Sequence, residues 1–135
     1  MRIKLAIATI IVAVFSVGAS AQSVTGKSLL LTCRAFVANE KTGPPADSSD
    51  ALRAGMCLGY MNGFMASDGL VISEGNKPFN LVFVESVTAA QIAHAFVSYM
   101  LKHPEEETHP AAHCVTNAAM NANLLHVVPR PPFSN

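Results

Sequence analysis

Two histidines in the last third of the chain have the spacing of a metal site. His109 and His113 are four residues apart, at the expected start of the last helix, so both imidazoles can face one ion. The catalytic zinc motif would place a glutamate directly after the first histidine, but this chain has Pro110 there. The spacing specifies no third ligand either. We therefore predict surface histidines, with no metal and no cofactor.

The same region holds residue types used in acid–base and nucleophilic catalysis. Glu105, Glu106 and Glu107 precede a helix start, where carboxylates complement the helix dipole and are usually solvated. Cys114 follows His113 directly, and adjacent helix residues point about 100° apart, so this imidazole does not face the thiol. Neither set has the converging geometry that catalysis requires. We predict that the protein is not an enzyme.

Helices must position these residues, because helical periodicity dominates the chain after its first segment. Thr88 and Gln91 form a capping box at the clearest helix start, and His103-Pro104 ends that helix. We expect four helices, at about 25–39, 48–67, 88–103 and 108–125. Residues 80–84 are β-prone but too isolated for a sheet, and the tail 127–135 is expected to be irregular. The predicted fold class is all-α, a small bundle of about four helices.

The second expected helix carries three glycines at four-residue intervals, Gly55, Gly59 and Gly63. Each interior glycine costs about 1 kcal/mol of helix stability relative to alanine. We interpret the stripe as a surface for close backbone packing within a continuous, buried helix; the alternative is a helix that breaks at one glycine. On the packing interpretation, Gly59→Leu unfolds the protein.

The first 21 residues have the pattern of a secretory signal peptide. A basic start with Arg2 and Lys4 precedes an apolar run over 5–17, and Ala19-Ser20-Ala21 is a cleavage site. The alternative, a membrane anchor, needs about 20 apolar residues, more than this run supplies. We therefore expect a helical domain over 22–135, exported to the periplasm.

Charge limits the partners of that domain. Of nine Lys and Arg residues, Arg2 and Lys4 leave with the signal peptide, so seven basic residues face nine acidic ones. A domain with this slight excess of acidic residues does not have the excess of basic residues that binding to nucleic acid or to an anionic membrane requires. We expect no nucleic-acid partner and, after cleavage, no membrane partner.

Three cysteines remain in the expected domain, Cys33, Cys57 and Cys114. Export to an oxidising compartment favours a disulfide, and the odd number leaves one thiol over. Cys33 lies late in the first expected helix and Cys57 early in the second, so antiparallel helices would bring them together. We predict a Cys33–Cys57 disulfide in preference to a pairing with Cys114.

Four motifs occur in a distinctive order: GKSLLLTC, CLGYMNGF, VTAAQ and YMLKHPEEETHPAA. Their order and spacing resemble the small periplasmic immunity proteins of type VI secretion amidase effectors, the Rap or Tai group. The resemblance runs from about residue 26 to residue 125. The motif positions are Leu29, Leu30, Cys33, Cys57, Tyr60, Gly63, Val87, Thr88, Gln91, Tyr99, Met100, His103 and Pro104.

The resemblance implies an all-helical, often homodimeric protein without catalysis of its own. Such proteins bind a cognate peptidoglycan amidase effector in the periplasm and block its cleft, which protects the producing cell. The loop 39–50 and the turn 72–80 are the candidate contact segments. The alternative is a periplasmic stress chaperone of the acid-activated type, because five histidines and nine acids make a response to pH conceivable.

Overall fold

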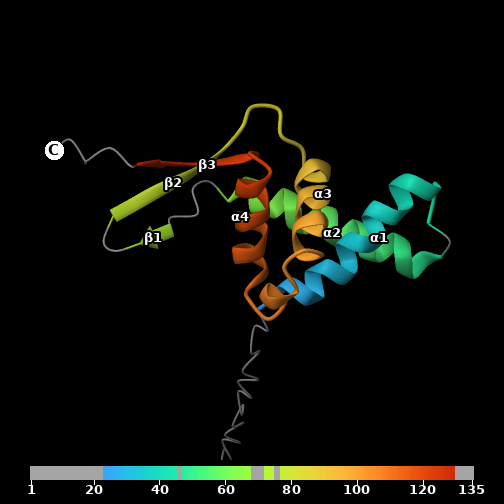
Figure 1. Cartoon of the computed structure of the whole chain (residues 1–135). Helices are drawn as coiled ribbons and strands as arrows, with labels where there is room; N and C mark the ends of the chain where they lie inside the picture. Colours follow the sequence, from blue (N-terminus) through green and yellow to red (C-terminus); the bar gives the residue numbers. More distant parts are fainter. Residues whose placement is uncertain (1–22, 46, 68–71, 75–76, 130–135) are drawn as a thin grey trace, which may run out of the picture.

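The computed structural model describes residues 23–45, 47–67, 72–74 and 77–129, so the expected signal peptide lies outside the described residues. Four α-helices form the body of the protein, as predicted (Figure 1). They are α1 (Gly26–Thr42), α2 (Ser48–Ala66), α3 (Ala89–Met100) and α4 (Ala111–Asn121), with a short 3₁₀ helix η1 (Pro104–Glu106) before α4.

Local hydrogen bonds explain two of the helix starts. The Thr88 hydroxyl accepts from the backbone N–H of Gln91, and the Gln91 side chain accepts from the backbone N–H of Thr88. Thr25 and Ser28 make the same reciprocal pair at the start of α1. Each pair satisfies backbone donors that a helix N-terminus otherwise leaves without partners. The capping box predicted at Thr88 is therefore confirmed.

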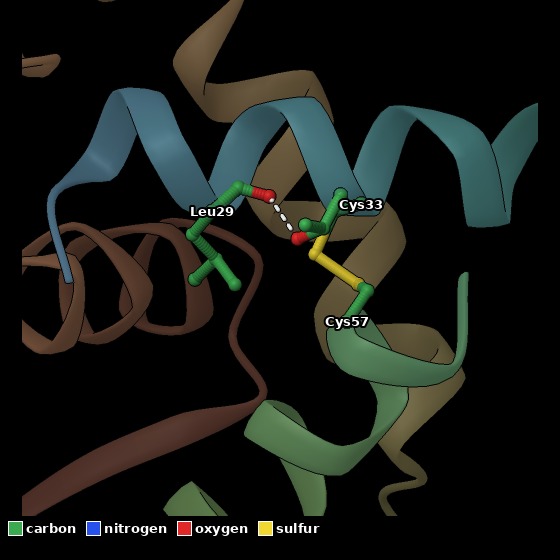
Figure 2. The surroundings of a disulfide bond; sticks show 4 residues. Leu29, Cys33 and Cys57 are labelled. Atoms are coloured by element: carbon green, nitrogen blue, oxygen red, sulfur yellow. Dashed lines mark hydrogen bonds between the residues drawn. A yellow bond between two sulfur atoms is a disulfide. The ribbon is translucent and has the colours of Figure 1, made fainter. Parts of the chain in front are cut away.

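All four helices contribute to one apolar core. Its fully buried side chains include Met61 from α2, Ile92 and Phe96 from α3, and Val115 from α4. The predicted disulfide is also present, between Cys33 of α1 and Cys57 of α2, with an S–S distance of 2.04 Å and a Cα–Cα distance of 4.9 Å (Figure 2). Both sulfurs lie in the core, so the bond fixes one face of α2 against α1.

A small sheet accompanies the helices and was not expected from the sequence. Strands β1 (Ile72–Glu74), β2 (Lys77–Phe83) and β3 (Leu125–Pro129) pair antiparallel in the order β1-β2-β3, and Figure 1 shows them beside α4. The expectation of an isolated β-prone run and an irregular tail was wrong for residues 80–83 and 127–129. The last helix was also predicted too long, because α4 ends at Asn121 and β3 begins at Leu125. Pairing from Phe79↔Pro129 to Phe83↔Leu125 joins segments that are distant in sequence, and each segment alone is too short to indicate a sheet.

A second buried cluster attaches this sheet to the bundle. Leu81 of β2 and Leu125 of β3 pack on Ala119 of α4, and Phe83 meets Phe64 of α2 edge to face with ring centroids 5.8 Å apart. These contacts cover the side of α4 that faces the strands. The strands therefore extend the helical core.

The structure confirms that α2 is continuous, but it contradicts both the burial predicted for the whole helix and the close packing assigned to its glycines. A Cβ added at Gly55, Gly59 or Gly63 would meet no atom within 4 Å, apart from its chain neighbours and the nearby backbone of α2 itself. The residues of α2 that are buried are Cys57, Met61 and Phe64. At about 100° per residue, Gly59 lies about 200° from Cys57, so fixing Cys57 to α1 turns the glycines toward solvent.

Close packing on a glycine occurs instead at the first residue of α1. A Cβ on Gly26 would lie 2.8 Å from the Cys114 sulfur, 3.0 Å from the Met100 methyl carbon and 3.1 Å from the Glu106 carbonyl oxygen. This glycine lets α1 begin directly against the segment that joins α3 to α4. The structure therefore leaves no room for a side chain at Gly26, whereas it leaves room for one at each of the three stripe glycines.

Candidate functional site

A polar cluster gathers at the junction between η1 and α4. Glu106 ends η1, His109 lies in the following turn, and His113 lies in the first turn of α4. One ligand atom from each side chain lies within 4.8 Å of the other two. The two imidazole rings meet edge to face with centroids 5.3 Å apart, and with Pro110 they line a shallow hollow of about 250 Å³.

Backbone hydrogen bonds hold this segment against the start of α1. The N–H of Gly26 donates to the carbonyl of His109 at 2.9 Å, and the N–H of Lys27 donates to the carbonyl of Glu107, also at 2.9 Å. In return, the N–H of Ala111 donates to the carbonyl of Val24 at 2.7 Å. The turn that carries His109 is therefore part of the packed structure.

Two neighbours orient the Glu106 carboxylate. The Tyr99 hydroxyl donates to it at 2.7 Å, and the Asn117 amide donates to its two oxygens at 3.2 and 3.4 Å. Burial, followed by the hydrogen bond to Glu106, raises the pKa of Tyr99 to about 12, so this hydroxyl stays protonated and donating at neutral pH. The carboxylate is half-buried and held from two sides.

Cys114 is a free, buried thiol beside this cluster. Its sulfur lies 3.4 Å from the carbonyl oxygen of Glu106, to which the S–H donates. Burial, with the charge of Glu106 as a second cause, raises the pKa of Cys114, which keeps the thiol protonated. This group has the environment of a structural cysteine rather than that of a nucleophile.

The other candidate residues do not join the cluster. His94 pairs with Glu40 of α1, and His103 pairs with Glu105 at 3.0 Å. Hydrogen bonds from its own backbone N–H and from His103 hold the pKa of Glu105 below its usual range. Glu105 is exposed. Of the three adjacent acids, Glu106 is therefore the one whose carboxylate lies beside His109 and His113. The only sequence signal for this is the E-x-x-H-x-x-x-H spacing of residues 106–113.

A second feature is the exposed face of α2, which we call the α2 stripe: Leu52, Gly55, Met56, Gly59, Gly63 and Ala66. Leu52 is 65% exposed and Met56 is 56% exposed. A shallow groove of about 330 Å³ continues this face, lined by glycines 59 and 63, by Tyr60, Phe64 and Ser67, and by Ala112 of α4. The α2 stripe is thus apolar and open, with a groove where side chains are missing.

The remaining motif positions serve the scaffold around these two features. Tyr60 is half-buried against the core, and burial is the first cause that raises its pKa. Gly63 lies on the α2 stripe. The His103 ring stacks on Tyr99 with centroids 4.2 Å apart, and Pro104 begins η1. His103 and Pro104 therefore set the turn that delivers Glu106.

The comparison with protein families decides the identity of this fold. The family model of the Rap1a immunity proteins matches residues 25–123. The chain belongs to the Rap1a immunity protein family. The match begins at the Thr25 cap of α1 and ends just after α4, so it includes all four helices, the α2 stripe and the polar cluster.

Two other comparisons add nothing to this Rap1a assignment. No curated protein and no solved structure gave a significant match to the chain. Within the described ranges, none of the helices combines the length and the apolar character needed to cross a bilayer.

Proposed function

We propose that this Rap1a family member is a non-catalytic periplasmic immunity protein that binds and inhibits a peptidoglycan amidase effector of type VI secretion. The match to the immunity protein family over residues 25–123 carries the proposal. The resemblance of the four sequence motifs to the amidase-specific group supplies the target. Binding of this kind would protect the producing cell from the effector.

The environments of the reactive groups support a role without catalysis. The free thiol of Cys114 is buried and protonated, and the Glu106 carboxylate is engaged by Tyr99 and Asn117. Export is part of the proposal, since a disulfide in the core requires an oxidising compartment to form and persist. We expect the exported protein to begin at Gln22, and N-terminal sequencing that found Met1 intact would contradict export by cleavage.

The α2 stripe is the first surface to test for effector contact. It is apolar and exposed, and its three glycines weaken α2 without contributing packing inside the chain. The two contact segments expected from the sequence, the loop 39–50 and the turn 72–80, contain less irregular chain than expected. Helix α1 continues to Thr42, which shortens the loop 39–50, and residues 72–74 and 77–80 belong to paired strands, while 75–76 lie outside the described residues.

The test begins with capture of the tagged protein from the periplasm of its own organism while type VI secretion is active. The captured partner is then purified, and its release of peptide from peptidoglycan is measured with increasing amounts of the protein. We expect an amidase whose activity falls to background at one equivalent. A partner without amidase activity, or an amidase that stays fully active, would contradict the proposal.

A matched pair of variants then locates the contact. Met56→Asp places a charge on the α2 stripe, whereas Leu31→Asp places one on an equally exposed apolar position of α1, 61% exposed. A charge buried at the centre of an interface should weaken inhibition by at least about thirtyfold. We expect that loss for Met56→Asp alone. Equal inhibition by both variants would move the contact away from α2 and leave the immunity role standing.

A further inference from the structure

We propose that Glu106, His109 and His113 form a binding site for a divalent transition-metal ion of the zinc type. The sequence offered two histidines at a metal-binding spacing but no third ligand. The fold supplies that ligand, because η1 ends at Glu106 and places its carboxylate beside the two imidazoles. This site goes beyond the immunity role and does not depend on it.

The first argument is the convergence of the ligand atoms. The three lie within 4.8 Å of one another, whereas ligand atoms on a tetrahedral zinc ion at its usual bond lengths are about 3.4 Å apart. The ligand atoms therefore need to approach one another by about 1.4 Å to reach the spacing of a tetrahedral zinc site. Both imidazoles are exposed and border the open hollow at Pro110, so the side chains have room to turn toward an ion, with the Asn117–His113 hydrogen bond given up on binding.

The second argument comes from the Asn117 amide nitrogen. It lies 3.0 Å from Nε2 of His113 and 3.2 Å from a Glu106 oxygen. An amide nitrogen only donates, so in this arrangement Nε2 of His113 is the acceptor. The lone pairs of His113 and Glu106 therefore already converge on one electropositive group. A cation that took the place of the amide hydrogens would find both ligands aimed at it.

The third argument is the support around the ligands. Tyr99 donates to the Glu106 carboxylate, and the backbone of the 106–111 turn is bonded to the start of α1. Hydrogen bonds from neighbouring groups to the ligating side chains hold those side chains in orientation and raise metal affinity. The turn is held before any ion arrives, so little ordering cost remains for the binding step.

The donor set indicates which ions fit. Two imidazole nitrogens and one carboxylate oxygen suit zinc, copper, nickel or iron, whereas calcium and magnesium prefer oxygen ligands alone. Three protein ligands leave a fourth position, which opens to solvent at the two exposed histidines. That position is available to water or to a side chain of a bound protein.

The experiment is calorimetric titration of zinc chloride into the untagged, chelator-treated protein at neutral pH. We expect one equivalent of zinc to bind and the melting temperature to rise with zinc concentration. His109→Ala, His113→Ala and Glu106→Gln should each weaken binding by at least about tenfold. The two histidines are exposed, so their removal should leave the circular dichroism spectrum unchanged.

His126→Ala is the matched control, because His126 is another exposed histidine but lies on β3, outside the cluster. Its zinc affinity should equal that of the unmodified protein. The proposal is overturned if the unmodified protein binds no zinc, if the cluster variants bind as tightly as the unmodified protein, or if His126→Ala loses as much affinity as they do. Cobalt(II) provides a second readout, since a tetrahedral site gives much stronger visible d–d absorption than the hydrated ion, and the cluster variants should lack this increase.

Discussion

Reduction of the Cys33–Cys57 disulfide should lower the free energy of unfolding by about 3 kcal/mol. The bond joins residues separated by 24 positions, and closing a loop of that size removes conformational freedom from the unfolded chain. Urea denaturation with and without dithiothreitol measures the difference. For a domain of this size, such a loss is a large part of the total stability.

The double variant Cys33→Ala/Cys57→Ala should lose at least as much stability, because two fully buried sulfurs also leave space in the core. Dithiothreitol should have no further effect on this variant. Cys114→Ala is the control for a buried thiol outside the disulfide, and its stability should still fall on addition of the reductant. A reductant that leaves the unmodified protein as stable as before would contradict the stabilising role of the bond.

Replacement of all three stripe glycines by alanine should raise the free energy of unfolding by about 2–3 kcal/mol. The Cβ atoms would extend into open space at Gly55, Gly59 and Gly63, so the helix gains propensity without a steric cost. The unfolded chain also loses some of the freedom that glycine allows. Urea denaturation measures the gain. Even Gly59→Leu should now leave the protein folded, contrary to the sequence-based expectation.

Gly26→Ala is the matched comparison and should change stability in the opposite direction. Its Cβ would lie within 3.1 Å of three atoms, one of them the Glu106 carbonyl oxygen in the backbone, and overpacking of this kind costs about 1–3 kcal/mol. A triple variant that is less stable than the unmodified protein would restore the close-packing interpretation. If the α2 stripe contacts the amidase, the more stable triple variant should also inhibit it less well.

The sequence by itself determined the helices, because their signals are local. The capping box at Thr88 and Gln91 lies within one turn, and each apolar face repeats within two turns of its own helix. The disulfide followed from the positions of Cys33, late in one expected helix, and Cys57, early in the next, because an antiparallel hairpin brings such positions together. The family resemblance followed from the order of four short motifs, and the match over residues 25–123 confirmed its immunity-protein part.

The tertiary structure alone decided which of these surfaces meet. Helix α2 has an apolar stripe at the glycines and another through Cys57 and Met61, and only the disulfide and the core select the second for burial. The pairing of β2 with β3 depends on segments on either side of α3 and α4. Glu106 comes to lie beside His109 and His113 because η1 and the start of α1 set the turn between them. Local periodicity encodes the faces that each element offers, whereas burial and pairing depend on contacts between residues far apart in the chain.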